Sequence, residues 1–145
     1  MTEPIYACLW FDGKALEAAK FYCAVFRNSK ITLETPMVVN FELNGTKFMG
    51  LNGGPNFKFN EAVSFVVNCE NQEEIDYYWT ALTADGGSES MCGWLKDKYG
   101  VSWQIVPANI GKLLMGDPEK SGKAMQALLQ MRKLVIADLE KAYNR

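Results

Sequence analysis

One absence restricts the chemistry open to this sequence: none of its 145 residues is histidine. Serine–histidine and cysteine–histidine nucleophilic catalysis, a histidine general base and every histidine-containing metal site are therefore excluded. Catalysis would have to use carboxylates, lysine, tyrosine, cysteine, amides or the backbone. The four cysteines form no Cys-x-x-Cys pair, so we predict free and mostly buried thiols at Cys8, Cys23, Cys69 and Cys92.

Polar residues interrupt two apolar runs that are typical of strands. Gln104 lies inside the run 101–106, which follows a glycine turn. Asn40 and Glu42 alternate with apolar residues over 37–43, which places both polar side chains on one face of a strand. Glu42 is the best titratable candidate for a functional role, and the same alternation also fits a solvated strand face.

The elements that must position these residues follow one order twice. A strand and an amphipathic helix are followed by shorter strands, with glycine-containing breaks between them. The first copy is predicted at 4–11, 14–26, 30–35, 37–43 and 46–51, and the second at 62–68, 71–84, 93–96 and 101–106. A shift of 58 residues places Leu9 on Val67, and a shift of 55 places Met49 on Gln104. The sequence therefore predicts two βαβββ modules of about fifty residues each.

Beyond Pro107 the pattern becomes helical. Asp117-Pro118 predicts a helix start, with an N-cap followed by proline at the first helical position. Apolar residues then recur at helical spacing over 118–131 and 134–143. We therefore predict an α+β fold, one domain over 1–145, with module one at 1–56, module two at 60–107 and a C-terminal helical tail at 108–145.

Composition excludes several classes of protein. The net charge of −2 provides no basic surface for nucleic acid or an anionic membrane. No apolar run approaches the ~20 residues that span a bilayer, and the N-terminus lacks a secretory pattern. We expect a cytoplasmic protein whose partner is a small molecule, with no nucleic acid and no membrane.

Four stretches carry a family resemblance. They are LWFDGKALEAAKFY (9–22), FELNGTKFMGLNGGP (41–55), SFVVNC (64–69) and CGWLKDKYGVSWQIVP (92–107). Together they resemble the PhnB-like branch of the vicinal oxygen chelate (VOC) superfamily, which includes glyoxalases, bleomycin-resistance proteins and dioxygenases. This branch carries the label "3-demethylubiquinone-9 3-methyltransferase-like". The resemblance extends over nearly the whole chain, including AMQALLQM (124–131).

The resemblance implies glyoxalase-like half-barrels around a pocket, commonly in a homodimer, and in many members a divalent metal. The metal ligands of such members would fall at Tyr6, Met49, Ser64 and Gln104, the first and third within two residues. Hard divalent cations prefer carboxylate or imidazole ligands, and one amide with a thioether does not replace them. We therefore predict no metal and no other cofactor. A glycine-rich nucleotide loop after the first strand is also missing, so the methyltransferase label fits this sequence poorly.

A pocket where the two modules meet is the expected binding site. We predict that Gln104 faces this pocket and that Trp103 and Ile105 point to the opposite face. The full set of predicted pocket residues is Tyr6, Trp10, Glu42, Met49, Ser64, Cys92, Trp94 and Gln104. For the tryptophans and Cys92, ordinary core packing is the alternative. Three possibilities stay open: binding of a small molecule without turnover, a metal-independent enzyme that uses Glu42, Tyr6 or Cys92, and a dimeric scaffold with a vestigial pocket.

Overall fold

The computed structural model describes residues 4–145, and its contacts divide the chain into two compact units, Met1–Phe59 and Asn60–Arg145. Each unit contains a four-stranded mixed sheet with a helix of its own. Three further helices follow in the second unit. The α+β fold class, with two βαβββ modules and C-terminal helices, is confirmed.

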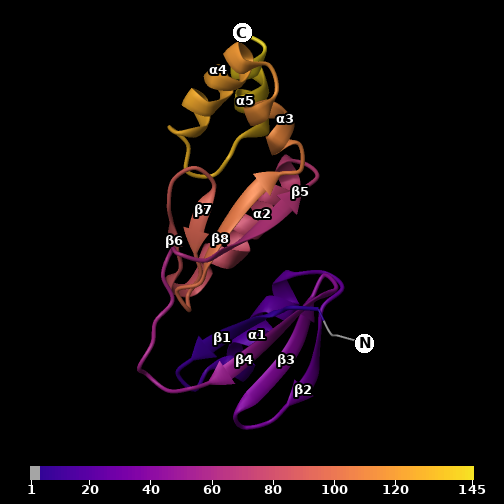
Figure 1. The fold of residues 1–145 in the computed structure, drawn as a ribbon, viewed down its shortest axis with the longest axis vertical. Coiled ribbons are helices and arrows are strands. Elements are labelled where there is room, and N and C mark those ends of the chain that lie inside the picture. The colour runs from indigo at the N-terminus through magenta and orange to yellow at the C-terminus, as the bar shows by residue number, and fades with distance from the viewer. Residues whose placement is uncertain (1–3) are drawn as a thin grey trace. The chain divides into compact units, whose positions relative to one another are not determined.

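The first unit has the strand order β1-β4-β3-β2 (Figure 1). Its elements are β1 (Ala7–Phe11), α1 (Ala15–Val25), β2 (Lys30–Glu34), β3 (Val38–Leu43) and β4 (Thr46–Asn52). β1 and β4 are parallel, and the other two pairs are antiparallel. Asn44 and Gly45 turn β3 into β4 with φ angles of 50° and 86°, the positive values that the Asn-Gly pair predicts for a tight hairpin.

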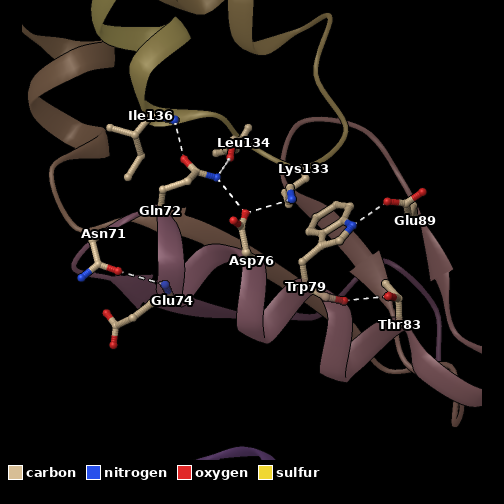
Figure 2. Close-up of polar contacts among 10 residues, drawn as sticks. All are labelled: Asn71, Gln72, Glu74, Asp76, Trp79, Thr83, Glu89, Lys133, Leu134 and Ile136. Atoms are coloured by element: carbon tan, nitrogen blue, oxygen red, sulfur yellow. Dashed lines mark hydrogen bonds and ion pairs between the residues drawn. The ribbon is translucent and has the colours of Figure 1, made fainter.

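The second unit repeats this topology with the order β5-β8-β7-β6. Its sheet and helix are β5 (Ser64–Cys69), α2 (Gln72–Thr83), a 3₁₀ turn η1 (Ala84–Gly86), β6 (Ser88–Glu89), β7 (Trp94–Lys96) and β8 (Ser102–Pro107). Asn71 caps α2, because its side chain accepts a hydrogen bond of 2.9 Å from the Glu74 amide (Figure 2). The parallel pair β5–β8 corresponds to β1–β4.

Strand register confirms the duplication. Cys8 lies opposite Met49 in the first sheet, and Val66 lies opposite Gln104 in the second. These two pairs are related by the same shifts of 58 and 55 residues that the sequence indicates. Met49 and Gln104 are therefore equivalent positions of the two modules.

Each sheet buries one face against its helix. In β3 the side chains alternate between half-buried and buried, and Phe41 on the buried side is fully enclosed. Gly50 permits the close approach of α1, since a Cβ atom there would lie 3.1 Å from the Cβ of Ala15. We call the opposite side of each sheet, away from its helix, the open face.

The tail forms α3 (Ile110–Met115), α4 (Pro118–Leu128) and α5 (Ile136–Tyr143). Asp117 caps α4 as predicted, since its carboxylate accepts a hydrogen bond of 3.0 Å from the Lys120 amide and Pro118 begins the helix. The tail has a buried core of its own that includes one residue of β8: Val106, Leu113, Leu128, Leu134 and Leu139.

Residues 129–135 connect α4 and α5, and we call residues 131–136, which end on the first residue of α5, the tail strap. The amides of Cys92 and Gly93 donate to the carbonyls of Met131 and Arg132 at 2.7 and 2.8 Å. The helix predicted to reach residue 131 ends at Leu128, because the amides of Gln130 and Met131 bond to carbonyls three residues back, not four. None of the helices in residues 4–145 is long and apolar enough to cross a membrane.

Candidate functional site

Gln104 is the centre of a polar cluster on the open face of the second sheet. Its Nε2 donates a hydrogen bond of 2.9 Å to Ser64 Oγ, from β8 to the first residue of β5. Trp94 of β7 lies directly opposite Gln104 on the other side. All three side chains are half-buried. Three of the eight predicted site residues therefore lie close together in this unit.

The neighbours of Gln104 in the chain point to the helix-covered face, as predicted. Trp103 and Ile105 are 3% and 0% exposed. The Trp103 indole donates to the carboxylate of buried Asp97 at 2.9 Å, and that carboxylate also accepts the amides of Tyr99 and Val101. Asp97 is thus a structural carboxylate that holds the turn before β8, and it does not lie at the candidate site.

The open face of the first sheet carries the positions equivalent to those around Gln104. Met49 lies between Cys8 and Asn40, and all three come from adjacent strands. Glu42 is the next residue of β3 on this face, and it is half-buried. Tyr6 precedes β1, and the Lys47 ammonium lies 4.1 Å above the centre of its ring, in cation–π geometry.

Trp10 is covered by the segment that follows β4. Its indole donates to the Gly54 carbonyl at 2.9 Å, and its ring meets that of Phe57 edge to face at 4.9 Å. Gly53 is required there, because a Cβ atom would lie 2.4 Å from the indole ring. Trp10 therefore shares the open face of the first sheet while also holding this segment in place.

Cys92 is positioned by the tail strap. Its φ angle is 62°, a conformation that non-glycine residues rarely adopt, and its amide bonds to the strap. The side chain is half-buried and packs against the apolar core of the tail. Its contacts therefore differ from those of Trp94 and Gln104.

Burial reduces the reactivity of other thiols. Burial, aided by the nearby Glu74 carboxylate, raises the pKa of the Cys69 thiol to about 12. Desolvation also raises the pKa values of Cys8 and Cys23, although Cys8 is exposed and Cys23 half-buried, so the prediction of mostly buried thiols holds fully only for Cys69. These three thiols are protonated at neutral pH and are poor nucleophiles.

Met49, Gln104 and their neighbours on the adjacent strands do not fit a divalent metal. The equivalent positions Met49 and Gln104 offer a thioether and a neutral amide, and their neighbours across the strands include no carboxylate. Within residues 4–145, no three His, Cys, Asp or Glu residues come together to hold a metal ion. The donor set therefore disagrees with the metal that the VOC resemblance implies.

Two residues of the open faces have polar atoms that are buried and, among the described residues, lack a hydrogen-bond partner: Asn40 Oδ1 and Ser102 Oγ. Ser102 and Lys96 were not among the predicted site residues. They lie opposite each other, and Ser102 lies opposite Ser64 on its other side. The signal in the sequence was alternation, since Ser102 is two residues before Gln104 and shares its face.

The comparisons with known proteins agree with this architecture. Residues 3–106 match the family model described as 3-demethylubiquinone-9 3-methyltransferase. A PhnB protein from Bacillus cereus with the same methyltransferase description is 36% identical, with a TM-score of 0.66 over 73% of this chain and 100% of that one. No curated protein sequence matches significantly.

Two more distant structures share the fold. A glyoxalase-related enzyme from Fulvimarina pelagi is 15% identical, with a TM-score of 0.56 over 76% of this chain and 91% of that one. A glyoxalase/bleomycin resistance protein from Albidiferax ferrireducens is 16% identical, with a TM-score of 0.53 over 70% and 95%.

The description of the family implies S-adenosylmethionine, and the described residues do not fit it in the usual way. Doubly wound parallel sheets bind such nucleotides at the carboxyl ends of their strands. Each sheet of this chain has a single parallel pair.

The match over 3–106 and the relative at 36% identity nevertheless establish the family. The chain belongs to the PhnB-like 3-demethylubiquinone-9 3-methyltransferase family, and its fold is that of the glyoxalase/bleomycin resistance (VOC) proteins.

Proposed function

We propose that the open face of each sheet binds a small organic molecule and that no metal takes part. The observation that carries this proposal is the pair of buried polar atoms without a partner among the described residues, Asn40 Oδ1 and Ser102 Oγ. Buried polar groups are nearly always hydrogen-bonded, so an exception is typical of a site that a ligand or water completes. Both exceptions lie on open faces.

The chemistry of these faces supports the same proposal. Small-molecule sites combine apolar and aromatic walls with a few polar groups that fix orientation. On the first sheet Met49 and Tyr6 supply apolar and aromatic surface, and Asn40 supplies an amide. On the second sheet the corresponding groups are Trp94 and Gln104.

The test uses the side-chain amide resonances of Asn40 and Gln104 in a ¹⁵N-labelled protein dialysed against EDTA. Titration with a library of neutral aromatic fragments should shift these two resonances. Those of Asn60 and Gln126, which are exposed, should stay in place. Shifts that require added Mg²⁺ or Mn²⁺ would overturn the metal-free proposal, and a library without any effect on either amide would overturn binding at these faces.

The same titration with S-adenosylmethionine examines the methyltransferase description. The proposal predicts no shift of Gln104 and no transfer of a methyl group to demethylated quinone analogues. Saturable binding that is followed by methyl transfer would replace the binding proposal with an enzymatic one.

We also propose that the chain is a homodimer, as its resemblance to the VOC proteins implies. Several apolar side chains of the second unit support this proposal, since Val63 and Val66 are 65% and 54% exposed. Light scattering coupled to gel filtration should give twice the chain mass of 16.3 kDa. A mass equal to that of one chain would contradict the dimer.

A further inference from the structure

A continuous row of hydrogen-bond donors crosses the open face of the second sheet. Ser88 of β6 lies opposite Lys96 of β7, Lys96 lies opposite Ser102 of β8, and Ser102 lies opposite Ser64 of β5. Side chains in such direct pairs have Cβ atoms only about 5 Å apart. One ammonium group and three hydroxyl groups are therefore aligned from one edge of the sheet to the other.

The row borders a hollow of about 260 Å³. Ser88, Lys96 and Ser102 line it, together with Trp94. Ser102 is 1% exposed, and its hydroxyl lacks a partner among the described residues. Ser64 accepts its hydrogen bond from Gln104, so its own hydroxyl hydrogen is available to donate. Because the row consists of groups that can donate, it suits an acceptor-rich ligand.

Two carboxylates also border the hollow, and their contacts differ. Glu89 accepts a hydrogen bond of 2.6 Å from the Trp79 indole (Figure 2). Glu61 instead forms an ion pair with Lys96, and that contact lowers the pKa of the Glu61 carboxyl. Glu61 belongs to the short segment before β5, and its side chain is 60% exposed. A carboxylate of the chain itself is thus bound to the one cation of the row.

We propose that this donor row binds an oxyanion, a carboxylate or phosphate group of a small ligand, and that the ligand displaces Glu61 from Lys96. This inference deepens the proposed function and rests on it, since the hollow belongs to the same open face as Gln104. Exposed ion pairs contribute about a factor of five or less to an equilibrium constant. An anion in the hollow can also accept from Ser102 and Ser88, which line it, and these added bonds favour the exchange.

The competition predicts that anion binding tightens when the Glu61 charge is removed and stays unchanged when an exposed carboxylate elsewhere is removed. Acetate, benzoate and inorganic phosphate are titrated while the backbone amide resonances of Lys96 and Ser102 are followed. Glu61→Gln should tighten anion binding about two- to fivefold. Lys96→Met should weaken it at least tenfold, and Lys96→Arg should retain it. Glu119→Gln and Lys112→Met, on exposed helical positions, are the matched controls and should leave the affinity unchanged.

Benzyl alcohol, the neutral counterpart of benzoate, separates the two proposals. If it shifts Gln104 as strongly as benzoate does, and Lys96→Met has no effect, the open face binds ligands and the oxyanion inference is overturned. If neither probe shifts Gln104, Lys96 or Ser102, both proposals are overturned. The inference is supported if benzoate causes shifts that Lys96→Met removes and Glu61→Gln strengthens. Comparison of the affinities for phosphate and acetate then identifies the preferred anion.

Discussion

Replacement of Gln72 by alanine should loosen the tail from helix α2. The side chain joins α2 to the tail strap, 62 residues away in sequence at Leu134 and 64 away at Ile136 (Figure 2). Its Nε2 donates to the Leu134 carbonyl at 2.9 Å, and its Oε1 accepts from the Ile136 amide at 2.8 Å. Nε2 also donates to Asp76 at 3.0 Å, and that carboxylate pairs with Lys133.

The magnitude follows from the backbone groups that lose their partner. Each hydrogen bond contributes about 1 kcal/mol net, and a group left buried without a partner costs somewhat more. Leu134 is fully buried, so the free energy of unfolding should fall by about 2–3 kcal/mol. The bond to Asp76 adds little because that carboxylate and Lys133 are largely exposed.

Urea unfolding followed by tryptophan fluorescence measures this loss, with Gln126→Ala on the exposed side of α4 as the matched control. Hydrogen exchange should show that the Ile136 amide loses protection in the Gln72 variant and keeps it in the control. If the free energies of unfolding of the two variants differ by less than about 0.5 kcal/mol, the hydrogen bonds of this side chain do not stabilise the strap as inferred.

Three further predictions concern the second unit. Asp97→Ala removes the carboxylate that accepts three donors and should lower the free energy of unfolding by about 3 kcal/mol; a loss under 1 kcal/mol in urea would contradict this. Gly122→Ala, which meets no atom within 4 Å, should raise the melting temperature, whereas Gly87→Ala, whose Cβ would lie 2.7 Å from backbone, should lower it. Because burial raises the pKa of Cys69 to about 12, Ellman's reagent at pH 8 should modify this thiol only on unfolding; since Cys8 is exposed, the modified residue is located by mass spectrometry, and rapid modification of Cys69 in the folded protein would refute the assignment.

The elements of the fold follow from local sequence where the signal is local. Asn44-Gly45 predicts the hairpin because few other pairs tolerate two positive φ angles. Asp117-Pro118 predicts the start of α4 through its side-chain cap. The two shifts that reveal the duplication also predict that Met49 and Gln104 are equivalent, and the register of the sheets confirms this.

Features that depend on distant partners are not visible in the sequence. β6 has only two residues, too few for any periodicity, and exists because Ser88 pairs with Lys96. The hydrogen bonds of Gln72 join segments more than sixty residues apart. Ser102 looks like an ordinary strand residue until cross-strand pairing places it between Lys96 and Ser64.

For the candidate site, the sequence predicts on which face of a strand a side chain lies, but not what that side chain contacts. Alternation places Gln104 and Trp103 on opposite sides of β8, and the burial of Trp103 agrees. Cys92 illustrates the limit, because the strap that holds its positive φ follows it by about forty residues. A residue list from pattern alone therefore cannot separate Cys92, which packs on the tail, from Trp94, which lies opposite Gln104.

We propose that the open sheet faces bind a small molecule without metal. The most direct measurement is the titration of EDTA-treated, ¹⁵N-labelled protein with neutral aromatic fragments, with the side-chain amides of Asn40 and Gln104 observed. Saturable shifts of these two resonances are expected, and none for the exposed amides of Asn60 and Gln126. Shifts that appear only after a divalent metal is added, or the absence of any shift at Asn40 and Gln104, would contradict it.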